Sequence, residues 1–313
     1  MKIGIIGGAG YIGSHVTQQL LAAGHHVRVS ASQPAAAERY AHLPSLPGAI
    51  DRLELVPLDL LQPEQLSPFL AGCDAVIHTG TPFQLNVDNP ERALIDPTVE
   101  GTRHLLAALS AHPNLRKLVF IASVAAHNTH YPFDVPGHEG PYTEQDPPYY
   151  SAEDHPYSRG KYRADQLVRN FLRTYTGECE IVTLSPVGVF GAALSDRQAC
   201  TSVGMMHALR HRILDDPFVE MLFEQDASLA VVDVRDVATA AVRALELPRL
   251  HGRHFLLSVG SYPASDLHRL LNGQEPLAAP QQVYNAGASR RALGLEYHPA
   301  TAFLRSESAA HSA

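Results

Sequence analysis

The chain has 313 residues, 45% of them hydrophobic, and its 32 Asp and Glu outnumber 24 Lys and Arg, which gives a formal charge of −8. This length and composition suit an enzyme with a large core, whereas the dispersed cations and the lack of a basic run argue against a nucleic-acid partner. The sequence has no apolar stretch of about 18 residues and no signal peptide, so we expect no membrane association and a cytoplasmic location.

A strand, a glycine-rich turn and a helix open the chain. Lys2–Ile6 is typical of a short buried strand, and Gly-x-x-Gly-x-x-Gly follows before a helix that we expect from about Ser14 to Ala23. This order brings backbone N–H groups and the positive end of a helix to one point, where a pyrophosphate can approach closely. An ordinary tight turn is the alternative interpretation. The residues that we assign to a dinucleotide here are Gly7, Gly10, Tyr11, Ile12 and Gly13.

The end of the second predicted strand, His26–Ser30, bears on cofactor choice. A carboxylate normally stands at this point and binds the ribose hydroxyls of NAD, but Val27 to Ser32 contains none. No acid is therefore present to repel a 2′-phosphate, and Ser30, Ser32, Arg28 or Arg39 could bind one. We expect NADP(H) as the cofactor, with NAD(H) as the open alternative.

The N-terminal half continues to alternate strands with helices. Continuous apolar runs such as Leu118–Ala122 are typical of parallel strands that are buried on both faces. The pattern predicts an α/β fold, a doubly wound parallel sheet of the Rossmann kind, whose ligands bind at the carboxyl edge. The further strands expected are Leu53–Pro57, Ala75–His78, Leu118–Ser123 and Ile181–Ser185, and the further helices are Val99–Ala111 and Tyr157–Tyr175.

Tyr157 and Lys161 are four residues apart, so they share one face of the predicted helix. The chain has only 3 Lys. A free phenol has a pKa of about 10 and is a poor acid at neutral pH, so we expect a nearby cation to lower it. Ser123 ends its strand at the carboxyl edge, where it could join them, although a local backbone cap is the alternative for a strand-end serine. The predicted catalytic residues are Ser123, Tyr157 and Lys161.

Together, the glycine spacing, Ser123, Tyr157 and Lys161 resemble the extended short-chain dehydrogenase/reductase family of the NAD-dependent epimerase/dehydratase superfamily, from Met1 to about Arg305. Cys73–Pro82 and Asp88–Thr102 look most like the dihydroflavonol reductase and cinnamoyl-CoA reductase branch. Sugar-nucleotide epimerases usually carry Asn where this chain has Thr98. The resemblance implies hydride transfer between a nicotinamide and a carbonyl, with Tyr157 as proton donor, Lys161 on the nicotinamide ribose and Ser123 on the carbonyl oxygen.

The same resemblance implies further contacts. Asp59 and Leu60 match adenine contacts, with helix capping as the alternative for Asp59. The remaining cofactor residues implied are His78, Thr79 and Gly80 on a loop that lines the cofactor, and Pro186 and Val189. Family members often pair through the two helices predicted at Val99–Ala111 and Tyr157–Tyr175, so a homodimer is expected. The charged residues there that could equally be solvated are Arg103, Arg163, Asp165 and Arg169.

A small-molecule carbonyl substrate is expected in a pocket that the segment Ala125–Pro156 covers. This segment is long and rich in His, Pro, Tyr and Gly, as in a loop rather than a core element. Its possible aromatic walls are Tyr131, Phe133, Tyr142, Tyr149 and Tyr150. Together with Pro186–Phe190 they favour an apolar or aromatic substrate. The substrate contacts that we predict are Phe83, Gln84, Tyr150 and Phe190.

Beyond Pro186 the pattern is looser. Ala192 to Gln225 predicts a helix and loops, Leu229–Val234 and the helix Val237–Leu245 return to the main domain, and His254–Ser258 forms one more strand. The predicted domains are therefore a dinucleotide-binding domain at 1–185 with 229–258, a substrate lobe at 186–228 and 259–305, and a disordered tail at 306–313.

The cysteines and histidines do not form a complete metal site. Cys73, Cys179 and Cys200 are far apart, which is typical of reduced thiols. His25-His26 and His127-x-x-His130 lack a third and fourth ligand nearby, so we expect no metal. Two other functions stay open: a sugar-nucleotide epimerase or dehydratase that recycles bound NAD, and a dinucleotide sensor without catalysis.

Overall fold

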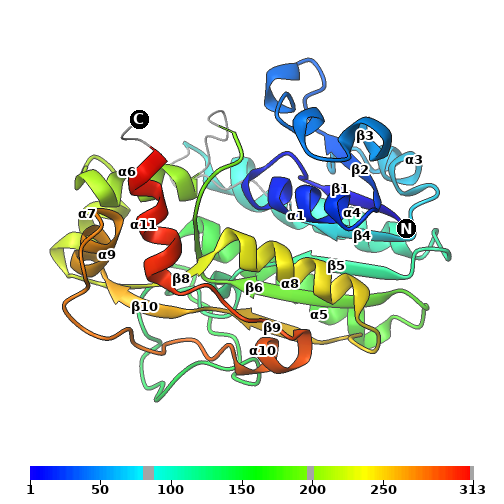
Figure 1. Cartoon of the computed structure of the whole chain (residues 1–313). Coiled ribbons are helices and arrows are strands. Elements are labelled where there is room, and N and C mark those ends of the chain that lie inside the picture. The colour runs from blue at the N-terminus through cyan, green and yellow to red at the C-terminus, as the bar shows by residue number, and fades with distance from the viewer. Residues whose placement is uncertain (80–87, 196–200, 311–313) are drawn as a thin grey trace.

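The computed structural model describes residues 1–79, 88–195 and 201–310. Gly80, Phe83, Gln84 and Cys200 lie outside the described residues. Seven parallel strands form the main sheet in the order β3-β2-β1-β4-β5-β6-β9 (Figure 1). They are β1 (Lys2–Ile6), β2 (His26–Ala31), β3 (Leu53–Pro57), β4 (Ala75–His78), β5 (Lys117–Ile121), β6 (Glu180–Pro186) and β9 (His254–Leu257). The predicted doubly wound α/β sheet is confirmed.

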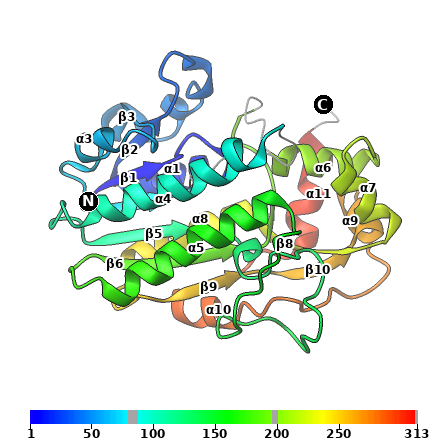
Figure 2. The ribbon, with the colours of Figure 1, turned by 180° about the vertical axis from the view of Figure 1, so that it is seen from behind.

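Helices cover both faces of this sheet. Figure 1 shows α1 (Tyr11–Ala22) and α8 (Val234–Glu246) side by side on one face, and Figure 2 shows α4 (Asp96–Leu109) and α5 (Pro156–Thr174) on the other. The central strands β1, β4 and β5 are largely apolar and buried because both of their faces meet helices. The core is therefore split into two layers, one on each side of the sheet.

A second, smaller sheet continues from the end of β6. Its strands are β7 (Gly188–Phe190), β8 (Ser228–Asp233) and β10 (Gly260–Pro263), in the order β10-β8-β7. Around it lie α6 (Thr201–His211), α7 (Pro217–Glu224), α9 (Ala264–Leu271) and α11 (Ala300–Ala310), while α10 (Gly287–Leu293) packs on β9. In Figure 1 this group stands at the left end of the molecule.

The structure corrects the sequence prediction at two points. Strand β8, expected with the main domain, belongs to the small sheet, because β9 occupies the edge of β6 and leaves β8 to pair with β7. The helix α8 and strand β9 do pack with the main sheet. The predicted disordered tail is helical as far as Ala310, since α11 consists largely of residues with good helix propensity.

Short helical turns complete the described part of the chain. They are η1 (Ala37–Arg39), η2 (Leu43–Ser45), α2 (Ala49–Arg52), η3 (Pro63–Gln65), α3 (Leu66–Leu70), η4 (Glu91–Ile95) and η5 (Val124–Ala126). Among the described residues, none of these helices or the longer ones is both long and apolar enough to span a bilayer.

Candidate active site

A cavity of about 160 Å³ opens at the carboxyl edge of the main sheet, where β6 passes into the small sheet. Ser123, Tyr157 and Lys161 all line it. Ile12 from α1 and Thr79, which follows β4, line it too. The structure thus brings the three predicted catalytic residues to one place beside the glycine turn.

Ser123 lies just beyond β5 and caps the helical turn η5. Its hydroxyl accepts the N–H of Ala125 at 3.1 Å. The same side chain also hydrogen-bonds with Tyr157. Capping and contact with the phenol are therefore compatible in this structure.

Tyr157 and Lys161 lie one turn apart on α5, with the Lys161 ammonium 5.6 Å from the centre of the Tyr157 ring. Burial raises the pKa of Tyr157 to about 12, against the opposing hydrogen bond from Ser123. The sequence predicts a lowered phenol pKa, and the structure differs from this prediction because loss of solvation outweighs the hydrogen bond from Ser123. Burial also lowers the pKa of Lys161 to about 8. At neutral pH the phenol keeps its proton and the lysine is mostly charged.

The start of α5 is fixed by local sequence. Pro156 occupies the first turn, where its missing N–H is harmless, and His155 accepts the Tyr157 N–H through Nδ1 at 3.2 Å. A Cβ on Gly160 would lie 3.4 Å from the Cα of Ile95, so α5 packs closely on the chain leading into α4. His155 also lines the cavity. The sequence signal that could have found it is a polar residue directly before a proline at a helix start.

The glycine turn provides close backbone approach where a dinucleotide would bind. Gly7 has φ 83°, and the Gly10 N–H donates to the Gly7 carbonyl at 2.9 Å. A Cβ on Gly13 would lie 2.1 Å from that carbonyl oxygen, so no other residue fits there. Tyr11 instead faces away, and its hydroxyl donates to the Gly191 carbonyl at 2.6 Å.

The residues near the end of β2 that are predicted to bind a 2′-phosphate have different surroundings in the structure. Arg28 is buried, and its guanidinium donates to Glu54 and to the carbonyls of residues 68, 69 and 71, so it is not placed to bind a phosphate. Ser30 accepts the Gly7 N–H at 2.9 Å, which ties β2 to the glycine turn. Ser32 and Arg39 are exposed beyond the strand, where Arg39 donates to Gln33 at 2.6 Å.

Asp59 and Leu60 make local contacts. The Asp59 carboxylate accepts the Leu61 N–H at 3.0 Å, which closes a local turn before η3 but does not cap that helical turn. The Leu60 carbonyl accepts from His104 Nδ1 at 2.7 Å, and its side chain packs against Gly101. Leu60 therefore joins the chain after β3 to α4, whereas the hydrogen bonds of Asp59 are local.

His78 and Thr79 point in different directions. Thr79 lines the cavity and its hydroxyl donates to the Ile6 carbonyl at 3.0 Å. His78 ends strand β4 rather than lying on a loop, is 1% exposed and stacks on Phe120 with 5.0 Å between ring centres. Burial and the charge of Lys161 lower the pKa of His78 to about 3. The predicted contact of His78 with a cofactor gains no support from this geometry.

The two predicted substrate contacts among the described residues, Tyr150 and Phe190, lie outside the cavity wall. Pro186 and Val189, which are predicted to contact the cofactor, do line the cavity. Tyr150 stacks on Tyr162 at the surface, and Phe190 is fully buried behind Gly188. Neither of these two side chains lines the cavity, so their substrate role gains no support.

Other walls of the cavity come from one aromatic candidate of the 125–156 segment and from residues of the small lobe that the sequence does not indicate. Tyr131 is the one residue among the five aromatic candidates of the 125–156 segment that lines the cavity in the described structure. The small lobe contributes Ser202, Met205, Phe218 and Leu229. Met205 and Phe218 lie on the amphipathic helices α6 and α7, and Leu229 lies on β8. Their sequence patterns indicate burial but do not show what these side chains pack against.

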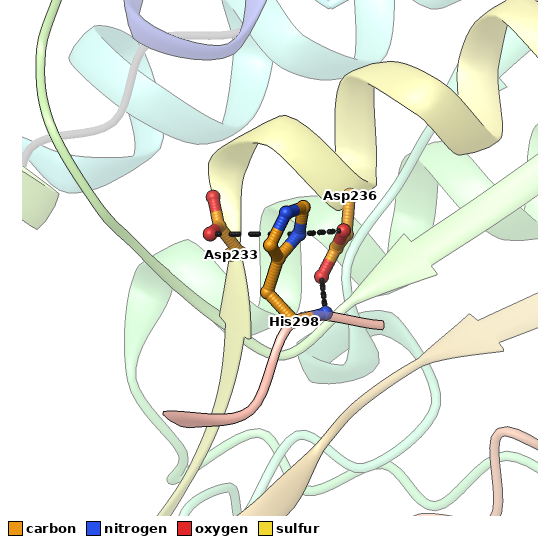
Figure 3. A group of neighbouring side chains, drawn as sticks. All are labelled: Asp233, Asp236 and His298. Carbon is orange, nitrogen blue, oxygen red and sulfur yellow. Dashed lines mark hydrogen bonds and ion pairs between the residues drawn. The ribbon is translucent and has the colours of Figure 1, made fainter. Parts of the chain in front are cut away.

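Figure 3 shows a group that the sequence does not predict, formed by Asp233, Asp236 and His298. Asp236 accepts both the N–H and the Nδ1 of His298, at 2.9 and 2.6 Å. The buried Asp233 carboxylate caps α8 and pairs with the Arg235 guanidinium at 2.5 Å. Because Arg235 already supplies a positive charge, the group is explained as an ion-pair network that fixes residue 298 to α8. Of the cysteines, Cys73 and Cys179 are buried free thiols.

Comparison with known proteins agrees with this architecture. A cinnamoyl-CoA reductase of Medicago truncatula is 28% identical over 310 residues, which cover 94% of this chain and 90% of that protein. The ketoreductase azaE of Aspergillus niger is 26% identical, with 95% and 93% covered. Among solved structures, yeast methylglyoxal/isovaleraldehyde reductase Gre2 complexed with NADPH has a TM-score of 0.81 at 20% identity, covering 99% and 97%.

A UDP-glucose 4-epimerase from Bifidobacterium longum in complex with NAD⁺ and UDP shares the fold with a TM-score of 0.75 at 19% identity, covering 99% of each chain. At such identities the solved structures establish the fold alone. The sequence pattern common to the NAD dependent epimerase/dehydratase family matches residues 3–258, most of the chain. The chain belongs to the NAD dependent epimerase/dehydratase family.

Proposed function

We propose that this protein is an NADP(H)-dependent reductase that transfers hydride to the carbonyl of a small aldehyde or ketone. The observation that carries the proposal is the meeting of Ser123, Tyr157 and Lys161 in one cavity beside the glycine turn. Relatives described as reductases, across nearly the whole chain, support reduction over epimerisation.

In this proposal the substrate carbonyl oxygen lies against the hydroxyls of Tyr157 and Ser123. A bound reduced nicotinamide supplies the hydride, which adds to the carbonyl carbon. The Tyr157 proton passes to the oxygen as negative charge develops there, which yields the alcohol. Ser123 stabilises the same oxygen, and the charged Lys161 favours the phenolate left behind.

The cofactor assignment rests on both ends of its binding site. The glycine turn packs so closely on the start of α1 that a Cβ at Gly13 would meet the Gly7 carbonyl oxygen. Such a turn brings the N-terminal end of α1 close to the position where a pyrophosphate would bind. Beyond β2, Ser32 and Arg39 are exposed where a 2′-phosphate would lie. Because β2 ends without a carboxylate, NADP(H) is favoured, and NAD(H) is the alternative.

The substrate is a small and largely apolar compound in this proposal. The part of the cavity formed by the small lobe is lined mainly by apolar side chains, including Met205, Phe218 and Leu229. Among the described lining residues, Lys161 is the only lysine or arginine. This composition suits an uncharged carbonyl compound better than a nucleotide sugar.

We also propose the division into a dinucleotide-binding part and a substrate lobe, a cytoplasmic location, and a homodimer through α4 and α5. The outer faces of these helices carry the ion pairs Arg103–Glu100 and Arg163–Glu91, which are compatible with water as well as with a partner. Asp165 and Arg169 instead pair at the sheet side of α5, with Asp165 buried. Light scattering at micromolar concentration tests the dimer, and a monomer mass would refute it.

Fluorescence titration with NADPH and NADH, followed by an aldehyde and ketone screen, tests the proposed function. We expect tighter binding of NADPH and its oxidation in the presence of a substrate. Tyr157→Phe should bind NADPH and lose turnover by about 10²-fold or more, since it lacks the proton donor. Tightly bound NAD in the purified protein with turnover of nucleotide sugars alone would favour the epimerase, and unchanged biological effect of Tyr157→Phe would favour a sensor.

A further inference from the structure

Tyr131 is fixed between two strands of the small sheet. Its hydroxyl donates to the carbonyl of Ala230 in β8 at 3.2 Å and accepts the N–H of Gly188 in β7 at 3.3 Å. The two strands are neighbours, with Gly188 in register with Val231. The phenol therefore occupies a position between backbone groups of adjacent strands at the wall of the cavity.

Packed aromatic rings support Tyr131 from behind. The centre of the Tyr284 ring lies 6.1 Å from that of Tyr131, and Tyr284 stacks on Tyr142 at 5.2 Å. Tyr142 in turn stacks on His138 at 3.8 Å. The Asn285 N–H donates to the Tyr142 carbonyl at 2.8 Å, which joins the two chain segments. Because Tyr142 and Tyr284 are buried, Tyr131 cannot move backward without disturbing this column.

Tyr131 also stands close to the proposed proton donor. Tyr131 and Tyr157 line the same cavity, and their hydroxyl groups interact electrostatically. The Tyr131 hydroxyl is committed to two backbone groups, and burial raises its pKa well above the ordinary value. We therefore do not assign proton donation to Tyr131. Its ring forms a rigid part of the cavity wall.

We propose that Tyr131 sets the size limit for the substituent on the substrate carbonyl carbon. The inference rests on the proposed reductase function and names its substrate class: uncharged aldehydes and ketones with a short apolar substituent. Such a substituent fits against the apolar side chains of Met205, Phe218 and Leu229, which line the same cavity as Tyr131. A longer one meets the Tyr131 ring, which the two strands and Tyr284 hold in place.

The size limit can be measured with a series of methyl ketones of increasing chain length, each assayed with NADPH. Tyr131→Ala should raise the kcat/KM ratio of long to short ketones by about tenfold or more, the effect of a few methylenes gaining access to an apolar pocket. Tyr131→Phe keeps the ring and should keep the same limit on ketone chain length. The matched control is Tyr150→Ala, which removes an exposed ring of the same 125–156 segment that does not line the cavity.

Measurements of ketone binding distinguish failure of this inference from failure of the proposed reductase function. Titration calorimetry of the same ketones needs no turnover. It therefore tests whether Tyr131 limits the length of the ketones that bind, even if the wild-type protein reduces none of them. Admission of longer ketones by Tyr131→Ala and not by Tyr150→Ala supports the inference. An identical cutoff in wild type and Tyr131→Ala, or no binding to either, overturns it. If circular dichroism shows that Tyr131→Ala is unfolded, Tyr131→Leu takes its place.

Discussion

Arg169 donates from Nη2 to Nδ1 of His254 at 3.0 Å, and this contact fixes the histidine tautomer. A guanidinium can only donate, so Nδ1 is the acceptor and Nε2 carries the proton, which it donates to Ser185 at 2.7 Å. Arg169 also pairs with the buried Asp165 at 2.5 Å. The proposed catalytic helix α5 is thus joined to β9 and β6 by one chain of polar side chains.

Removal of Arg169 should destabilise the fold strongly. Arg169→Leu leaves the Asp165 carboxylate buried without its cation, which costs about 3 kcal/mol or more. Arg103→Leu is the matched control, because the exposed Arg103–Glu100 pair is worth only about 0.5 kcal/mol. Urea denaturation measures both variants. Equal effects of the two substitutions would show that the buried chain does not stabilise α5.

Acid should destabilise the protein well above the pH at which its carboxylates titrate. Burial lowers the pKa values of His78, His127 and His254 to about 3, about 4 and about 3. The unfolded chain protonates these histidines near pH 6.5 while the folded chain does not, so stability falls as pH decreases from about 6.5 to about 4. Each group adds a slope of about 1.4 kcal/mol per pH unit within that window.

Urea denaturation at pH 7.5 and pH 5 measures this dependence, and His78→Phe should reduce the loss. The raised pKa of the buried Asp165 acts in the opposite direction, because the folded chain then holds a proton that the unfolded chain releases. Stability that is equal at the two pH values would contradict the burial of neutral histidines.

The pH dependence of reduction should follow Lys161 rather than Tyr157. With a pKa of about 12, Tyr157 stays protonated across the usual assay range, while Lys161 loses its charge above about pH 8. The rate should therefore be flat below pH 8 and decline above it. Lys161→Arg keeps the charge, and any residual activity should lose this decline. A decline in the wild type that begins below pH 7 would be inconsistent with the assignment.

Gly13→Ala should abolish dinucleotide binding. The added Cβ would lie 2.1 Å from the Gly7 carbonyl oxygen, so the turn must open. We expect a loss of stability of about 1–3 kcal/mol together with loss of NADPH fluorescence enhancement. Gly204→Ala is the control, since its added Cβ meets no atom within 4 Å and alanine favours the α6 helix. Normal NADPH binding by Gly13→Ala would refute the turn as the pyrophosphate site.

Arg39 should determine the preference for NADPH. Arg39→Gln removes a charged partner for a 2′-phosphate and should weaken NADPH binding about tenfold with little change for NADH. Arg103→Gln, on the exposed side of α4, should change neither. Fluorescence titration of both cofactors gives the ratio. A parallel loss for NADPH and NADH would point to disruption of the β2 loop instead of phosphate recognition.

The fold follows closely from local sequence because the central strands of the main sheet are largely apolar on both faces. Runs such as Leu118–Ile121 predict buried parallel strands without knowledge of their neighbours. Tyr157 and Lys161 are predictable for a similar reason, since their spacing alone places them on one helical face. Contacts that depend on distant residues are harder to foresee. Arg28 is occupied by carbonyls some 40 positions away, which no pattern around β2 reveals.

The cavity walls show the same limit. His78 has the polar character of a ligand-loop residue, yet β4 extends through it, and it stacks on Phe120 from the neighbouring strand β5. Tyr131 and Tyr150 belong to the same aromatic-rich segment, and only the positions of β7 and β8 decide that Tyr131 is the one at the cavity. Strand β8 is equally hard to place, because a strand's own sequence does not name its partner.

The passage from β6 into β7 has a mechanical consequence. Pro186 ends a strand of the main sheet, and Gly188, two residues later, begins a strand of the small one. Both residues line the cavity. Since one nearly continuous strand carries the wall across both sheets, the two parts of the molecule have no free hinge at this point. Changes in substrate range are therefore expected to arise through exchange of side chains along a stiff wall, and the helices α6 and α7 are the parts left to adapt.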